Sequence, residues 1–298
     1  MRTLNVAFLV AVTCVVIQAQ SRSMADATYA LRGPVRTYRI EIATFVNKGS
    51  SYVEGPRVLL SEASFNEDGN RTDLRMYNDK GVLVRRIVMK FEGRRMIEAI
   101  NYDGNGKMGY RTVDQYDEEG RTKGSVTYDG EGSLISTAVI KRNSRGLVTE
   151  LTKHSSKGVL LEQMDRRYDG PKTISQDRKV YYPNGSLQLH SVWDFQTRRS
   201  EHTTYGRDGS VQDRTVRDNW DTAHYGGDGS LQKVTAFSEE TRLTADEITI
   251  NQGQPATRVS ERPDEVDAHG NWTKQTRWLT DAKGTRPLKV TYRALTYY

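Results

Sequence analysis

Cysteine is almost absent from this chain of 298 residues, since Cys14 is the only one. It lies in the apolar stretch Val6–Ile17, which has the character of a cleavable signal peptide. A mature chain without this stretch has no thiol, which excludes disulfides and thiolate metal sites.

Long apolar runs are equally scarce. No later segment approaches the roughly 18 apolar residues of a membrane-spanning helix, so we expect no membrane span.

Hydrophobic residues are few for a protein of this length, at 36% of the chain with a mean hydropathy of −0.72. This composition favours a thin or elongated structure in which each part buries little apolar surface. Charged residues make up 28% and are well mixed, with a formal net charge of +6. No run of Lys and Arg reaches five, and no basic stripe has interleaved aromatics, so we do not expect a nucleic-acid partner.

Catalytic and metal-binding motifs are also missing. The sequence contains no HExxH and no GxSxG pattern. The stretch Asn101–Gly106 resembles the start of a calcium loop, but Thr112 stands where that loop needs a bidentate Glu. We therefore predict no cofactor, no metal site and no enzymatic activity. A dispersed carboxylate pair of the glycosidase type stays open as an alternative.

The N-terminus predicts export. Arg2 provides a short positive start, the apolar stretch follows, and Ala19 offers a small residue for cleavage, so residues 1–19 are predicted as a signal peptide. The mature protein would be secreted, periplasmic or on the outer cell surface. A lipid anchor on Cys14 is disfavoured, because Thr13 is a poor residue before a lipidated Cys and apolar residues follow.

What the sequence does contain is a short stretch, Tyr128–Leu134, that is repeated along the chain. Asp favours the first position of a type I turn and Gly the fourth, where a left-handed residue completes a G1 bulge. With Asp129 first and Gly132 fourth, Asp129 pairs with Ser133 and Tyr128 lies opposite Leu134. The stretch therefore predicts a β-hairpin with an aromatic–apolar cross-strand pair.

This motif recurs along most of the chain. Eight of the twelve residues that stand four positions before a registered Gly are Phe or Tyr. In the copy at 182–185, Pro183 occupies the second turn position, which type I turns prefer. The registered glycines are Gly69, Gly81, Gly106, Gly120, Gly132, Gly146, Gly158, Gly185, Gly209, Gly229, Gly270 and Gly284.

Most glycines in this register are 12 to 14 residues apart, or about twice that. Such steps leave roughly eight or nine residues for each strand. We predict an all-β fold, an elongated and curling antiparallel meander, with a β-propeller or β-sandwich as the alternative. Residues 20–60 are predicted as an N-terminal β cap over the first edge strand, and 61–298 as the repeat domain. Within it, 238–263 is irregular, either degenerate strands or a long loop.

The Tyr-Asp-x-x-Gly-x-Leu units resemble the YD repeats of RHS-type bacterial surface proteins. The segment Asp267–Lys274 resembles a variant found in exported, repeat-only bacterial proteins, and Tyr181–Leu187 is similar to an antitoxin-like branch of MORN repeats. The resemblance covers roughly residues 65–290 and implies a long curling β-sheet. It implies a scaffold rather than toxin delivery, because the chain is too short to enclose a cargo domain and lacks the DPxGL-containing motif of the RHS core.

Tryptophans are the candidate ligand contacts. Aromatic side chains on a flat β-face can stack on sugars, although the same residues also suit a core ladder. The four are Trp193, Trp220, Trp272 and Trp278. We expect a non-enzymatic, exported scaffold or protein-interaction protein of the bacterial cell envelope, with a protein or a cell-surface glycan as partner. The alternatives are a carbohydrate- or peptidoglycan-binding module and, third, a cryptic hydrolase.

Overall fold

The computed structural model describes residues 31–219, 221–237, 245–251 and 254–298. The predicted signal peptide, the first part of the predicted cap and Trp220 lie outside these ranges. The described residues form 21 strands and no helix. The strands are β1 (Val35–Lys48), β2 (Ser51–Glu54), β3 (Val58–Phe65), β4 (Arg71–Tyr77), β5 (Leu83–Glu92), β6 (Arg95–Asp103), β7 (Met108–Tyr116), β8 (Thr122–Asp129), β9 (Leu134–Arg142), β10 (Val148–Ser155), β11 (Leu160–Asp169), β12 (Lys172–Tyr181), β13 (Leu187–Asp194), β14 (Arg199–Tyr205), β15 (Val211–Asp218), β16 (Asp221–Gly226), β17 (Leu231–Phe237), β18 (Ala245–Asn251), β19 (Gln254–Val266), β20 (Trp272–Asp281) and β21 (Gly284–Tyr297).

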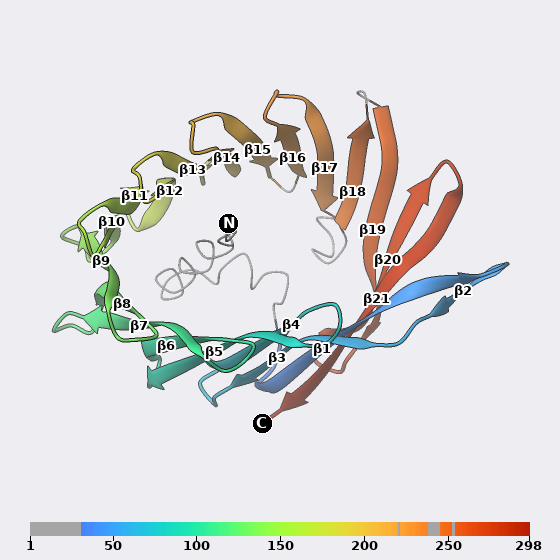
Figure 1. Cartoon of the computed structure of the whole chain (residues 1–298), viewed down its shortest axis with the longest axis horizontal. Helices are drawn as coiled ribbons and strands as arrows, with labels where there is room; N and C mark the ends of the chain where they lie inside the picture. Colours follow the sequence, from blue (N-terminus) through green and yellow to red (C-terminus); the bar gives the residue numbers. More distant parts are fainter. Residues whose placement is uncertain (1–30, 220, 238–244, 252–253) are drawn as a thin grey trace, which may run out of the picture.

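All of these strands belong to one sheet. From β3 to β21 each strand pairs antiparallel with the next, so the chain is a curling antiparallel meander (Figure 1), as predicted. A single sheet contradicts the alternative of a propeller or a sandwich, because those folds divide their strands among several sheets.

Strand β1 joins the two ends of the meander. Its residues 37–42 pair with β3. Its other edge pairs with β21, from Val35 opposite Tyr297 to Thr44 opposite Lys289, a contact that the sequence did not predict. The short strand β2 pairs with the far end of β1 as a hairpin (Figure 1). β1 thereby covers one edge of β3 and one edge of β21.

The repeated turn has the predicted geometry. Gly132 has a φ of 87°, its N–H donates to Asp129 O at 3.1 Å, and Tyr128 lies opposite Leu134. The Asp129 carboxylate accepts the N–H groups of Glu131 and Ser133 at 2.9 and 2.8 Å. All twelve registered glycines have positive φ. Only Gly accepts this conformation at little cost, because it has no Cβ.

The segment 238–263 contains strands where the structure describes it. β18 pairs with β17 and β19, and β19 pairs in turn with β20. Of the two open interpretations, degenerate strands are therefore correct for residues 245–251 and 254–263. Pro255 and Pro263 lie within β19. Residues 238–244 and 252–253 lie outside the described ranges.

The two faces of the sheet differ in burial, and we name them accordingly. The buried face is marked by Ala99, Thr112, Thr127 and Ser136, which lie opposite one another on β6 to β9 and are 1 to 4% exposed. The exposed face carries residues such as Lys90. Small hydroxyl and alanine side chains make up much of this burial, as the low hydropathy predicts. Apolar clusters are small, such as the one around Tyr38, Ile40 and Ala63.

Candidate functional site

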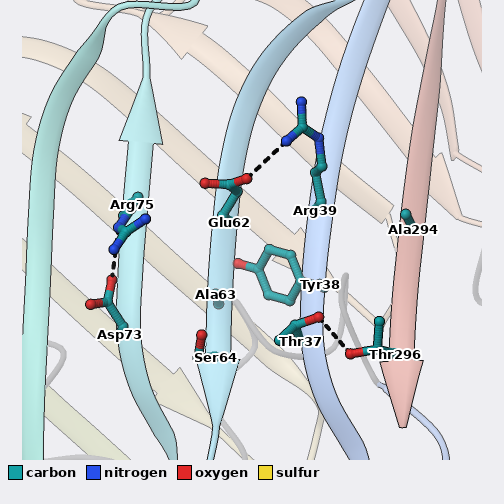
Figure 2. A pocket seen from close by; sticks show the side chains of 10 residues that line it. All are labelled: Thr37, Tyr38, Arg39, Glu62, Ala63, Ser64, Asp73, Arg75, Ala294 and Thr296. Atoms are coloured by element: carbon teal, nitrogen blue, oxygen red, sulfur yellow. Dashed lines mark hydrogen bonds and ion pairs between the residues drawn. The ribbon is translucent and has the colours of Figure 1, made fainter.

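A shallow pocket of about 410 Å³ lies where β1 joins the two ends of the meander. Figure 2 shows that its lining comes from β1, β3, β4 and β21. We call it the seam pocket. Thr37 on β1 and Thr296 on β21 share a hydrogen bond of 2.6 Å across it, although they are 259 positions apart in the sequence. The pocket therefore exists only when both ends of the chain are in place.

Charged side chains of both signs line the seam pocket. Arg39 bonds Glu62 at 3.0 Å on one side, and Arg75 contacts Asp73 at 3.5 Å on the other (Figure 2). Hydrogen bonding to Glu41 is the main cause that raises the pKa of Arg39. Both arginine side chains are about half exposed, at 50% and 45%. Exposed pairs of this kind contribute little to stability, so their charges remain available to a partner.

A hydrogen-bonded cluster holds the seam together. Asn271 is 2% exposed, accepts the Arg32 N–H at 2.7 Å and donates to Arg32 O at 2.9 Å. Its amide also donates to the Tyr297 hydroxyl at 2.9 Å. The His269 ring stacks on the Tyr297 ring with their centroids 4.0 Å apart. One turn of the repeat domain is thus bonded to the segment before β1 and to the C-terminal strand.

The three tryptophans that the structure describes do not form one site. Trp193 is on β13 and Trp278 on β20, and both are half-buried. Trp272 is only 6% exposed, and the Arg293 guanidinium lies 4.0 Å from the centre of its ring. This places Trp272 in the interior packing rather than at a ligand surface. Trp220 lies outside the described residues, so Trp193 and Trp278 are the candidates that keep accessible surface.

Trp193 belongs to a polar group on the buried face. Its ring meets the His202 ring edge-on, with the centroids 4.9 Å apart. His202 Nδ1 and Ser191 Oγ are 2.8 Å apart. Burial is the main cause that lowers the pKa of His202, with help from Arg178 and Arg217. Ser191 is 1% exposed, which shields its hydroxyl from any substrate, so we interpret this Ser–His pair as structural.

On the strands that precede β13, the same face carries closely spaced charges on β10 to β12. Arg178 Nε donates to Glu162 Oε1 at 2.7 Å, and both side chains are largely buried, at 15% and 9% exposure. Lys153 lies opposite Glu162 on β10. Burial, together with the charge of Arg178, lowers the pKa of Lys153, while Glu162 opposes this shift. We call Lys153 and Arg178 the cation pair, and Glu162 is the carboxylate that lies between them.

Sequence reasoning missed both the seam pocket and this charged group. In the described part of the chain, no group of three or more His, Cys, Asp or Glu side chains is placed to hold a metal ion. The sequence signal for this charged group was the alternation of side chains between the two faces of a strand. This alternation places Lys153 and Arg178 on the buried face of the sheet. The residues that lie opposite them on neighbouring strands could not be predicted, because the pairing of two strands depends on the register that the turn between them sets.

Comparison with known proteins gives only weak likenesses. No family model matches the chain, and no curated protein matches it. A porin-like protein from Bacteroides uniformis aligns with a TM-score of 0.33 at 9% identity, over 89% of this chain and 98% of that one. The Photorhabdus luminescens Tc holotoxin pore aligns with a TM-score of 0.19 at 10% identity, over 86% of this chain and 20% of that one.

A TcdB2–TccC3 structure gives a TM-score of 0.20 at 11% identity, over 82% of this chain and 18% of that one. At these scores none of the likenesses carries an argument about function. The resemblance to YD repeats stays a prediction, whereas the repeated β-hairpin architecture that it implies is observed. Within the described ranges, no helix is long and apolar enough to cross a membrane.

Proposed function

We propose that this chain is an exported, non-enzymatic interaction scaffold of the bacterial cell envelope, and that the seam pocket is its contact surface for a protein partner. The observation that carries the proposal is the lining of the pocket. Arg39 and Glu62, from β1 and β3, and Arg75 and Asp73, from β4, present four charged groups of alternating sign around one hollow.

A protein surface suits this hollow better than a small molecule does. Small-molecule sites are mostly apolar and enclose their ligand, with a few placed polar groups. The seam pocket is shallow, and exposed ion pairs flank it. Protein interfaces use such charges at the rim to orient a partner and to increase the rate of association. Tyr77 donates to Glu62 at 2.8 Å and holds that carboxylate in place for a cationic group of the partner.

Site-specific photo-cross-linking in the native envelope tests the proposal. A photo-reactive residue in place of Thr296 is expected to give one discrete protein adduct. The charge reversals Arg39→Glu and Arg75→Glu together should abolish this adduct, because they repel the acidic groups that the arginines would meet.

The matched control places the same photo-reactive residue at position 141, where Lys141 is 65% exposed and lies on β9, well away from the seam. That position should give no discrete adduct. Equal adducts from both positions, or an adduct at 296 that survives the double charge reversal, would refute a partner at the seam pocket.

A second candidate function, carbohydrate binding, is favoured by Trp193. Its indole is half-buried on a face that also offers hydroxyl groups, and His202 holds the ring edge-on. Titration with cell-wall glycan fragments should then shift the tryptophan fluorescence, and Trp193→Ala should remove the shift. Trp278→Ala, at the other accessible candidate on β20, shows whether that tryptophan causes the shift instead. A shift that persists in Trp193→Ala would exclude this role for Trp193.

A further inference from the structure

The cation pair on the buried face has more positive charge than its surroundings neutralise. Lys153 and Arg178 lie on either side of Glu162, on three consecutive strands. Glu162 accepts one hydrogen bond, from Arg178 Nε. One carboxylate therefore serves two cations. Arg166 adds a third cation nearby on β11, and its Nε donates to Gln176 Oε1, a neutral acceptor, at 2.7 Å.

The geometry of Arg178 leaves its outer end free. The guanidinium is held from the side through Nε, so Glu162 orients it without occupying both terminal amino groups. Among the described residues, neither these amino groups nor Lys153 Nζ donates a hydrogen bond. Such donors in a partly desolvated place cost free energy unless an acceptor meets them.

We propose that Lys153 and Arg178 form a binding site for a single oxyanion group, the carboxylate or phosphate of a ligand. A guanidinium presents two parallel N–H donors that match two oxygens of such a group, and a lysine ammonium adds a compact charge beside it. Glu162 acts as a positioning residue, because it fixes the Arg178 fork. The buried floor between the two cations is Met164, which is 3% exposed and lies opposite Arg178.

The surroundings agree with an anion at this position. His202 lies two strands beyond Arg178 in the same cross-strand row, and Arg178 is one of the charges that lower its pKa. The pKa of Lys153 is lowered by burial and by Arg178. A bound oxyanion would oppose both effects. The nearest acidic side chain along the row of Lys153, other than Glu162, is Asp114, three strands away on β7.

Isothermal titration of the full mature chain tests the site, with inorganic phosphate and acetate as separate probes at constant ionic strength. Wild type is expected to bind at least one of them, and the preferred probe tells whether a phosphate or a carboxylate is recognised. Lys153→Met and Arg178→Gln should each weaken binding by roughly tenfold or more, the size expected for a lost charge-assisted bond. Lys141→Met, on the exposed face, is the matched control and should bind as wild type does.

Nuclear magnetic resonance of the Lys153 side chain in the unmutated chain gives a second readout that does not depend on variants folding. The Lys153 pKa should rise when the preferred probe is added and stay unchanged with chloride at equal ionic strength. No heat and no pKa change with either probe would overturn the site, as would equal binding by Lys153→Met. This result is independent of the seam pocket, because Lys153 and Arg178 lie on β10 and β12, whereas the pocket is lined by β1, β3, β4 and β21.

Discussion

At the scale of single residues, Asp114 is the clearest exception to the rule that buried polar groups are satisfied. Its Oδ1 atom is buried and has no hydrogen-bond partner among the residues that the structure describes. Burial raises its pKa from 3.8 to about 7. The native state therefore keeps a proton between about pH 4 and pH 7, where the unfolded state has lost it. By linkage, this group lowers the free energy of unfolding as the pH rises through that window, and its effect is constant above it.

Asp114→Asn is accordingly expected to stabilise the protein at pH 8 by roughly 1–3 kcal/mol, because it removes the cost of a buried unpaired charge. The difference from wild type should shrink toward zero at pH 4. Urea unfolding at pH 4, 6 and 8 measures it. Asp165→Asn, at an exposed position on β11, should show no such trend. A difference that is the same at all three pH values would show that Asp114 is not protonated in the native state.

The burial of charged residues such as Asp114 could not be predicted from the sequence, for a physical reason. The turn Asp residues were correctly assigned to turn geometry, because their partners are two to four positions away, as in Asp129 with Glu131 and Ser133. Asp114 and Lys153 owe their environment to neighbours on other strands. The surroundings of Trp272 come from another strand in the same way, since Arg293 covers its ring, and its ligand role stays a prediction.

At the scale of elements, the repeated hairpin turn carries the fold. Apart from its chain neighbours, a Cβ added at Gly132 would meet no atom of the described residues within 4 Å, so the obstacle to another residue is the φ of 87°. For an L-residue this left-handed conformation costs about 1–2 kcal/mol. The local geometry is therefore a matter of backbone preference rather than packing, which explains why a linear motif was enough to predict it.

Gly132→Ala should thus reduce the free energy of unfolding by roughly 1–2 kcal/mol, as measured by urea denaturation. Gly109→Ala is the matched control. Gly109 lies in β7, its φ is outside the left-handed region, and an added Cβ meets only Asn101 O at 3.7 Å. That variant should be neutral or slightly more stable. If both substitutions cost the same, the left-handed turn is not what makes Gly132 necessary.

The strands between turns were predicted almost as well. Eight or nine residues were expected and most strands have seven to ten. Prediction stopped at 238–263, where no Gly-based turn was legible. β18 and β19 form there nevertheless, because they pair with β17 and β20 through backbone hydrogen bonds. No local sequence motif predicts this pairing.

At the scale of the whole molecule, β1 decides the architecture. An uncovered strand edge is a template for aggregation, and β1 covers one edge of β3 and one edge of β21. The Asn271 cluster reinforces this arrangement. Asn271 ties Arg32, just before β1, to the turn before β20 and to Tyr297.

Asn271→Ala should therefore lower the free energy of unfolding by about 2–4 kcal/mol, because it removes two hydrogen bonds to the Arg32 backbone and one to the Tyr297 hydroxyl, which keeps its bond to Asp267. Loosening at the seam should also expose strand edges, so larger species should be visible by size-exclusion chromatography with light scattering. Asn105→Ala, at an exposed turn position between β6 and β7, is the control and should change neither quantity. A monomeric Asn271→Ala protein of wild-type stability would contradict this role.

The sequence by itself determined the repeating unit, the antiparallel meander and the division into a buried and an exposed face. All three follow from interactions between residues a few positions apart: the turn chemistry of Asp and Gly, and the two-residue period of a strand. Only the tertiary structure decided that β21 meets β1, that a charged pocket forms there, and that Lys153 and Arg178 come to share one carboxylate. These contacts depend on the combined twist and register of many strands, which no local sequence pattern determines.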